Sequence, residues 1–238
     1  MSAIGDPAVA APEDDAADPP REVAPRVVLF DFDGVLIRGD SFAMFVRDRY
    51  AVSAWRKGMA LLGSPLWLLM LPLSRRLPIY LLVRIALLGL REPGYQAAAG
   101  AFAAVLARRP KQFCRDALSC LRRHQALGDR VIVVTGCEET LVSGILRELG
   151  LTGVEVIASQ LRPGWLGMRL RRHNVGRRKV QSLAEHGVDA WQVAYGDSMH
   201  DVAMLKPATE AVLVNATPKL CKKVEKALGR TLTRVEWF

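Results

Sequence analysis

Short runs of apolar and β-branched residues occur once near the start of the chain and repeatedly in its second half. Each is four or five residues long and ends at glycine or polar residues, which is typical of buried strands. Helical periodicity lies between the later runs, over 138–149, 177–186 and 218–228. The predicted strands are 26–30, 130–134, 154–158, 192–195 and 211–214. Alternating strands and helices predict a parallel, doubly wound α/β sheet, which binds ligands at the carboxyl ends of its strands.

A long helical insertion interrupts this alternation between the first and second predicted strands. Segment 41–125 has an almost wholly helical pattern. We therefore predict a helical cap inserted into an α/β core that consists of 26–40 and 126–238. Segment 1–25 is rich in Ala, Pro and Asp without periodicity, which predicts a disordered tail.

The insertion contains an unusually apolar stretch over 58–90. Its first part, 58–74, has 17 residues without a charge, and Arg84 alone interrupts the second part, 77–90. Seventeen residues are at the short limit for a spanning helix of roughly 20, and the prolines at 65 and 72 would kink it. Two interpretations remain open: a hairpin that dips into one membrane leaflet, or two buried cap helices that pack on each other.

The charge of the chain is strongly basic outside the tail. The net charge is +9, but the first 24 residues carry six acids and one base, so the remainder carries +14. Such a surface suits a polyanion or an anionic membrane, although a generally basic composition is the plain alternative. Aromatic residues are not interleaved with the basic run as a stacking platform for single strands requires, so no nucleic acid partner is expected.

The four cysteines and the N-terminal segment bear on the compartment. The cysteines show neither a CxxC motif nor a paired spacing, which favours a reducing compartment over a disulfide framework or a zinc site. The chain does not begin with a basic region followed by an apolar run, so no cleaved signal is expected. The active site is predicted on the cytoplasmic side.

Two acids follow the first predicted strand in the sequence DFDGV. Asp31 and Asp33 are two residues apart, and Gly34 lets the chain turn sharply after them. One carboxylate at such a position can attack while the other carries a proton. Because aspartate ionises well below pH 7, Asp31 needs no activating base. Taken alone, the motif also fits a surface acidic pair.

Two further motifs supply candidate ligands for an anion. Thr135 and Gly136 follow the second strand, close to a helix that is predicted to begin near residue 138. A hydroxyl beside free helix N-terminal amides forms a cradle for a phosphoryl group, although a helix cap alone has the same pattern. Lys179 lies in the helix opened by Gly176, where its charge would offset phosphoryl and aspartate charges. A surface lysine is its plain alternative.

The fourth motif, GDSMHD, is the most specific of the set. Asp197 and Asp201 lie four residues apart at a strand-to-helix junction, and Gly196 permits close approach. Two carboxylates at this spacing suit a hard cation that prefers oxygen. Mg²⁺ needs one or two carboxylates plus the substrate phosphate, so Asp31 and Asp197 would suffice, with Asp201 holding a bound water.

These four motifs, in this order over 26–216, resemble the haloacid dehalogenase superfamily of phosphatases. The resemblance implies a Rossmann-like sheet with an inserted cap and a reaction through an aspartyl phosphate on Asp31. It also implies that Asp33 protonates the leaving oxygen and later activates water. Finally, it implies a phosphoryl site made by Thr135, Gly136 and Lys179, and a Mg²⁺ site made by Asp31, Asp33 (through its backbone carbonyl), Asp197 and Asp201.

The insertion resembles the phosphoserine-phosphatase-like branch, in which the cap selects the substrate. The apolar stretch, together with 156–179, is similar to the phosphatidylglycerophosphatase C group, which acts at membranes on the terminal phosphate of phosphatidylglycerophosphate. This similarity implies a lipid phosphomonoester substrate and a location on the cytoplasmic side of the inner cell membrane. The candidate headgroup contacts are Arg171, Arg172 and Arg178, for which a solvated basic strand and helix start is the alternative.

Two other functions remain open at this point. One is a soluble, cytoplasmic phosphatase for a small phosphomonoester such as phosphoserine, in which the apolar insertion packs inside the cap. The other is a noncatalytic membrane adaptor that keeps the fold; the acids at 31, 33, 197 and 201 argue against it.

Overall fold

A computed structural model of the protein describes residues 25–70, 72, 74 and 76–237. The predicted tail 1–25 therefore lies outside the described residues, apart from Pro25. The apolar stretch 58–90 is described except for three positions near the end of its first part.

The described chain forms one seven-stranded sheet that is parallel except at one edge strand. Its order is β4-β3-β2-β1-β5-β6-β7, so the chain runs outward from β1 in both directions. The arrangement confirms the predicted fold class, and all five predicted strands are present. The strands are β1 (Val27–Phe30), β2 (Arg130–Glu138), β3 (Glu155–Arg162), β4 (Arg169–Arg172), β5 (Val193–Gly196), β6 (Glu210–Val214) and β7 (Thr233–Val235).

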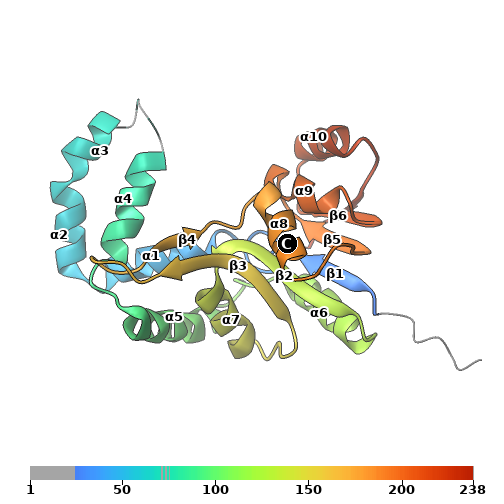
Figure 1. The fold of residues 1–238 in the computed structure, drawn as a ribbon, viewed down its shortest axis with the longest axis horizontal. Coiled ribbons are helices and arrows are strands. Elements are labelled where there is room, and N and C mark those ends of the chain that lie inside the picture. The colour runs from blue at the N-terminus through green and yellow to red at the C-terminus, as the bar shows by residue number, and fades with distance from the viewer. Residues whose placement is uncertain (1–24, 71, 73, 75, 238) are drawn as a thin grey trace, which may run out of the picture.

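Helices cover both faces of this sheet (Figure 1). In β1, Val28 and Phe30 enter the core on one face and Leu29 enters the core on the other, as the two-residue period of a strand requires. The first face is covered by α5 (Glu92–Ala107), α6 (Arg115–Ala126) and α7 (Glu139–Glu148). The second is covered by α8 (Arg177–Glu185), α9 (Val202–Leu205), which follows the short 3-10 helix η1 (Met199–Asp201), and α10 (Pro218–Leu228).

Two edge strands and the position of α6 differ from what the sequence predicted. β4 and β7 were not among the predicted strands, because one is dominated by arginine and the other has three residues. α6 falls inside the predicted cap, yet Leu121 is fully buried in the sheet's core and the Cys120 thiol lies 3.3 Å from the Tyr195 hydroxyl on β5. Helical periodicity alone does not separate a cap helix from the crossover helix that a parallel connection needs.

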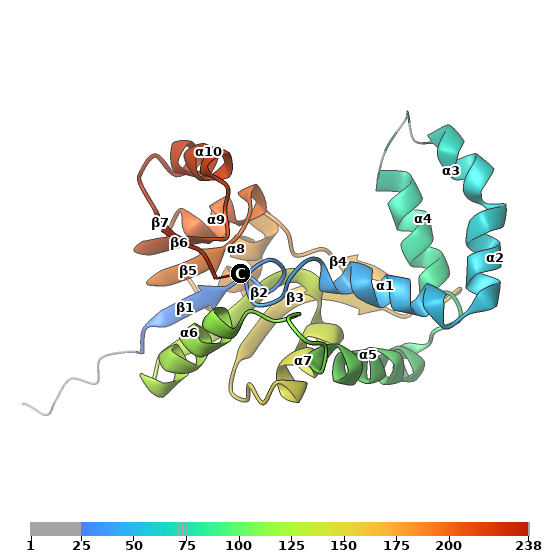
Figure 2. The ribbon, with the colours of Figure 1, turned by 180° about the vertical axis from the view of Figure 1, so that it is seen from behind.

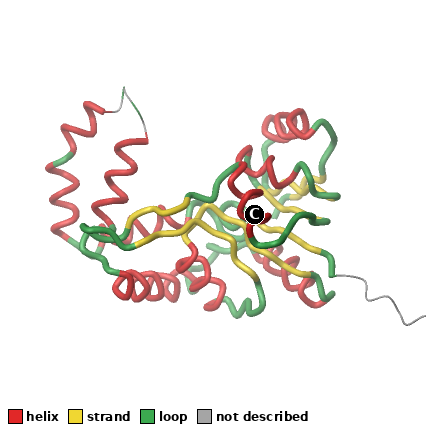
Figure 3. The backbone as a smooth tube through the Cα atoms, viewed as in Figure 1, coloured by secondary structure: helices red, strands yellow, loops and turns green. Residues whose placement is uncertain are grey.

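The first four helices of the insertion form an arm that projects from the core, whereas α5 packs on α7 (Figures 2 and 3). They are α1 (Ser41–Ala51), α2 (Ala54–Leu62), α3 (Ser64–Met70) and α4 (Arg76–Ala86), and α2 and α3 contact α4. The Tyr50 hydroxyl donates to the Leu82 carbonyl at 2.7 Å, which ties α1 to α4. Arg56 donates to the Leu88 carbonyl at 3.1 Å, which ties α2 to the end of α4.

The arm exposes many large apolar side chains, which we call the apolar surface of the arm. Leu62, for example, is 85% exposed. The helices therefore pack on each other without being buried. No helix among the described residues is both long and apolar enough to cross a membrane. The surface consists of Trp55, Met59, Leu61, Leu62, Leu68, Leu69, Leu77, Ile79 and Tyr80.

The β3–β4 hairpin joins the sheet to the arm. Its turn approaches the end of α4, where Gly89 donates its N–H to the Leu166 carbonyl at 3.0 Å and Leu88 pairs with Gly167. The guanidinium of Arg84 donates to the Met168 carbonyl at 2.9 Å. The hairpin therefore holds one end of the arm against the core.

We predict that Gly167→Ala destabilises the protein by loosening this junction. Gly167 has φ of +122°, and a Cβ there would lie 2.3 Å from the Leu87 carbonyl oxygen. The matched control is Gly187→Ala, which has φ of +71° and open space around its Cβ position. The control incurs only backbone strain of about 1–2 kcal/mol, so thermal unfolding should show a larger loss of Tm for Gly167→Ala. Equal losses would contradict the close contact.

Candidate active site

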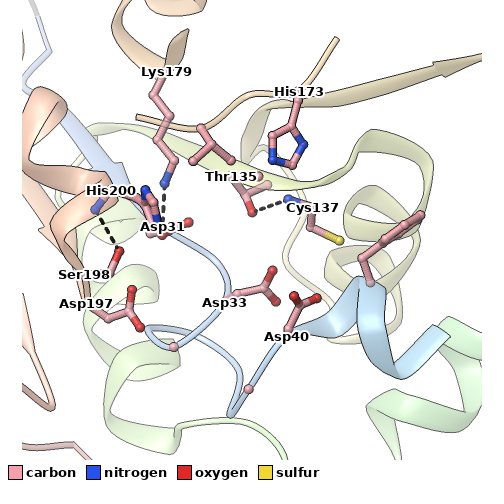
Figure 4. Close-up of a pocket in the computed structure, with 15 residues that line it drawn as sticks. Asp31, Asp33, Asp40, Thr135, Cys137, His173, Lys179, Asp197, Ser198 and His200 are labelled. Atoms are coloured by element: carbon pink, nitrogen blue, oxygen red, sulfur yellow. Dashed lines mark hydrogen bonds and ion pairs between the residues drawn. The ribbon is translucent and has the colours of Figure 1, made fainter. Parts of the chain in front are cut away.

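The predicted chemical residues meet at the carboxyl ends of β1, β2 and β5, where parallel strands end at one edge of the sheet. They surround a cavity of about 860 Å³ (Figure 4). Segments that are far apart in sequence thus share one space, as the four motifs predicted. The lining comprises Asp31, Asp33, Gly34, Gly39, Asp40, Phe42, Thr135, Gly136, Cys137, His173, Val175, Lys179, Asp197, Ser198 and His200.

Asp31 is the first residue after β1, and its backbone and side chain are both held. Its N–H donates to the Tyr195 carbonyl at 2.9 Å, which continues the pairing of β1 with β5. One carboxylate oxygen accepts the Phe32 N–H at 2.7 Å, and the other lies 2.9 Å from the Lys179 ammonium group. The carboxylate is thus oriented at the cavity wall, as a nucleophile must be.

Asp33 and Gly34 form the turn that follows. The Asp33 carboxylate accepts the N–H of Ser41 at 2.8 Å, which anchors it to the first residue of α1. Burial raises the pKa of Asp33 to about 6, although the hydrogen bonds with Ser41 oppose the shift. Gly34 has φ of +81°, and a Cβ there would lie 1.9 Å from an Asp197 carboxylate oxygen. Glycine is therefore required for the turn to pass beside Asp197.

Lys179 and Asp201 form a buried ion pair next to Asp31. The Lys179 ammonium lies 2.7 Å from Asp201 as well as 2.9 Å from Asp31. Asp201 also accepts the backbone N–H groups of Asp197 and Ser198, both at 3.1 Å, and the Ser198 hydroxyl at 2.9 Å. Asp201 thereby fixes the loop that carries Asp197, while Lys179 fixes Asp31.

The charged groups of this cluster shift one another's pKa values. Burial, followed by the charge of Asp201, raises the pKa of Asp31 well above its usual value. The same two causes raise the pKa of Asp197 to about 6. Burial opposes ionisation of Asp201, but the charge and hydrogen bonds of Lys179 hold its pKa below the ordinary value. Burial lowers the pKa of Lys179, but Asp31 and Asp201 together raise it above that of a free lysine.

This donor set fits a divalent metal ion. One carboxylate oxygen from each of Asp31, Asp197 and Asp201 lies within 4.8 Å of the other two. Lys179 supplies a single positive charge against these three acids, and the raised pKa values of Asp31 and Asp197 reflect burial first and the charge of Asp201 second. Oxygen ligands with uncompensated charge are what Mg²⁺ requires.

Thr135 and Gly136 line the cavity, but their local structure differs from the prediction. β2 continues through Glu138, and α7 begins at Glu139, so Thr135 lies within a strand and not at a helix N-terminus. Its hydroxyl accepts the Cys137 N–H at 3.0 Å, and the Gly136 carbonyl accepts the Ser159 hydroxyl at 2.7 Å. The helix-terminal cradle expected at Thr135 is therefore not formed.

The three arginines predicted as headgroup contacts lie elsewhere. Arg171, Arg172 and Arg178 are not among the described residues that line the catalytic cavity or the apolar cavity next to it. Arg172 instead pairs with Glu185 on α8. Arg171 and Arg172 are neighbours in β4, where side chains alternate between faces, and Arg178 lies on α8, so the basic run does not direct all of its charges to one site.

Asp40 and Phe42 line the cavity although the sequence did not single them out as site residues, and His173, from the basic stretch within 156–179, lines it with them. Asp40 caps α1 by accepting the Ala43 N–H at 2.8 Å, so its capping position was visible in the sequence while its place beside Asp33 was not. His173 follows β4 and enters from the opposite side, as Figure 4 shows. Burial lowers the pKa of His173. Asp40, Phe42 and His173 lie close together because the start of the insertion and the β3–β4 hairpin meet at the carboxyl ends of the strands.

Comparisons with known proteins agree with this architecture. Protein CicA of Caulobacter vibrioides is 31% identical over 194 residues, which are 78% of this chain and 84% of CicA. A solved protein of unknown function from Bordetella pertussis Tohama I superposes with a TM-score of 0.66 at 21% identity, covering 89% of this chain and 99% of that protein. A substrate-bound phosphoserine phosphatase superposes with a TM-score of 0.54 at 18% identity, covering 90% and 94%.

The two structural likenesses concern the fold, since both identities are low. The sequence match is more specific, because the model of haloacid dehalogenase-like hydrolases matches residues 28–206 and thus includes all four motifs. This match confirms the family that the motifs predicted. The chain belongs to the haloacid dehalogenase-like hydrolases.

Proposed function

We propose that the protein is a Mg²⁺-dependent phosphomonoester hydrolase in which Asp31 is the nucleophile. The observation that carries this proposal is the contact between Asp31 and Lys179 at the edge of a cavity that Asp33 and Asp197 also line. A nucleophile, a proton carrier and a fixed cation are the groups that transfer of a phosphoryl group to aspartate requires.

The proposed reaction has two steps. A carboxylate oxygen of Asp31 attacks phosphorus, and the bond from phosphorus to the ester oxygen breaks while Asp33 gives that oxygen a proton. Water then attacks the phosphorus of the aspartyl phosphate and gives a proton to Asp33. The bond between phosphorus and Asp31 breaks, so phosphate leaves and Asp31 is restored. The raised pKa of Asp33 supports this role, because a carboxyl group that titrates near neutral pH can both give and take a proton.

Asp31, Asp197 and Asp201, with the backbone carbonyl of Asp33, are the residues that would hold Mg²⁺. When bound, Mg²⁺ would offset the charge of the phosphoryl oxygens and the aspartates. Lys179 holds Asp31 in place and contributes a second positive charge to the same end of the cavity. Asp201 keeps the Asp197 loop in position through its three hydrogen bonds.

We further propose that the substrate is a lipid phosphate, such as phosphatidylglycerophosphate, and that the enzyme works at the cytoplasmic face of the cell membrane. The apolar surface of the arm supports this proposal. From residue 49 to residue 91 the chain contains seven arginines and lysines and no acid. Exposed apolar side chains accompanied only by positive charges suit an anionic lipid surface. The four cysteines are free, as in a reducing compartment.

We predict that Asp31→Asn lowers kcat on the order of 10³-fold or more, because an amide does not replace a nucleophilic carboxylate. Phosphate release from p-nitrophenyl phosphate with Mg²⁺ measures the loss. The matched control is Asp189→Asn, which is exposed and lines neither cavity, and it should keep wild-type turnover. Comparable turnover of the Asp31 variant, with a wild-type unfolding curve, would refute the assigned nucleophile.

We predict that Asp197→Asn weakens Mg²⁺ binding at least about tenfold, because it removes a carboxylate from the oxygen cluster. Calorimetric titration with Mg²⁺ measures affinity directly, and phosphate release against Mg²⁺ concentration should shift in parallel. Chelation should stop turnover by the wild type, and added Mg²⁺ should restore it. An unchanged affinity in the variant would remove Asp197 from the metal site.

We predict that the protein sediments with vesicles of anionic phospholipid and that added salt weakens this binding. Leu62→Glu should reduce binding about tenfold or more, since it removes an exposed leucine that would otherwise enter the lipid. Leu127→Glu is the matched control, because Leu127 is 69% exposed at the end of α6, outside the arm. Equal binding by both variants would argue against contact through the arm.

A further inference from the structure

A second cavity of about 510 Å³ adjoins the catalytic cavity. Asp40, Phe42, Gly136 and His173 line both, so the two spaces meet at these four residues. The second cavity lies between the arm and the β3–β4 hairpin, because its remaining walls come mainly from α4, β3 and β4. A group attached to a phosphate at Asp31 can therefore extend past His173 into this space.

The walls of the second cavity are largely apolar. Val83 and Leu87 face it from α4 and the residues that follow, and Leu161 and Leu170 face it from the hairpin. Leu87 is buried, whereas Val83 and Leu161 are half-buried. A cavity of this size and lining is typical of sites for apolar parts of small ligands.

Three polar side chains in these walls have partners within the protein, and Tyr80, Arg169 and His173 also line the cavity. Glu138 accepts the Tyr95 hydroxyl at 2.5 Å and the Leu141 N–H at 3.0 Å. Ser159 donates to the Gly136 carbonyl at 2.7 Å, and Arg84 donates to the Met168 carbonyl at 2.9 Å. These bonds hold the walls together and leave apolar side chains as the main surface offered to a ligand. The apolar parts of a leaving group can be buried there without losing hydrogen bonds to water.

The outer end of the second cavity reaches the apolar surface of the arm. Ile79 and Tyr80 belong to both, and they are 62% and 51% exposed. An apolar path thus runs from the exposed face of α4, through the second cavity, to the residues beside Asp33. Its two ends differ in character, since one is an apolar surface and the other is a site for a charged phosphoryl group.

We propose that the second cavity binds the apolar chain of the leaving group, which enters between α4 and the β3–β4 hairpin. This inference rests on the proposed phosphomonoesterase activity and adds that the enzyme recognises the apolar chain of its substrate. The cavity selects by apolar length and shape, and Val83 and Leu170 set the space available. Selection occurs within the protein and needs no membrane.

The test is hydrolysis of n-alkyl phosphates, from ethyl to octyl, as monomers without vesicles. In the wild type, kcat/KM should rise about two- to fourfold for each added methylene over the first carbons, as expected for burial of an apolar chain. The absence of vesicles separates recognition by the cavity from recruitment to a lipid surface, and added vesicles in a second arm measure the latter.

Two variants fill the second cavity from opposite walls. Val83→Trp acts from α4, and Leu170→Trp acts from a partly exposed position on β4 that tolerates a larger side chain. Each should lower the ratio of kcat/KM for octyl phosphate to that for ethyl phosphate at least tenfold. Val105→Trp, on the exposed face of α5 outside both cavities, is the matched control and should keep the wild-type ratio.

The outcomes distinguish this inference from the proposed function. If the wild type hydrolyses all esters with the same kcat/KM, or if both filled variants keep the wild-type ratio, the second cavity does not bind the chain, although the protein remains a phosphatase. If no ester yields phosphate in a reaction that depends on Asp31, the proposed function itself fails.

Discussion

The structure depends on one electrostatic constraint, which is that several carboxylates must be kept together where water is largely excluded. Asp31, Asp197 and Asp201 approach within 4.8 Å of one another at the ends of neighbouring strands, and Lys179 offsets part of their repulsion. A buried carboxylate needs a cation or hydrogen bonds to remain charged. Asp201 has both, whereas burial and neighbouring charge raise the pKa of Asp31 and Asp197. The same imbalance makes this edge of the sheet suited to a divalent ion and a phosphoryl group.

Different parts of the fold hold the charged cluster and form the second cavity. Strands and the short loops after them hold the charged groups, and helices on both faces bury the strands that carry them. The insertion contributes little to the charge cluster beyond the Ser41 N–H that anchors Asp33. Its arm instead supplies an apolar surface and one wall of the second cavity. The β3–β4 hairpin supplies the opposite wall and contacts the end of α4, so the width of that cavity depends on the junction between sheet and arm.

Parts of the site that are encoded in short segments could be predicted from the sequence. Asp31 and Asp33 follow a buried strand directly, and Asp197 follows β5 with Asp201 four residues later at the end of η1. Strand pattern and spacing thus placed them at one edge of the sheet. Local pattern was less informative at Thr135, because the apolar run ends at Val134 whereas the strand continues for four more residues, TGCE, to Glu138. It also misassigned α6, whose amphipathic pattern is equally compatible with a cap or a sheet surface.

The sequence by itself determined the fold class, five of the strands and the acids that meet at the end of the sheet, because each depends on periodicity or on spacing within a few residues. Only the tertiary structure decided that Asp40 and His173 join the cluster, that Arg171, Arg172 and Arg178 do not line its cavity, and that an apolar cavity connects the site to the arm. These features depend on how the insertion and the hairpin pack across the end of the sheet. Such packing is set by contacts between residues distant in sequence, which no local pattern specifies.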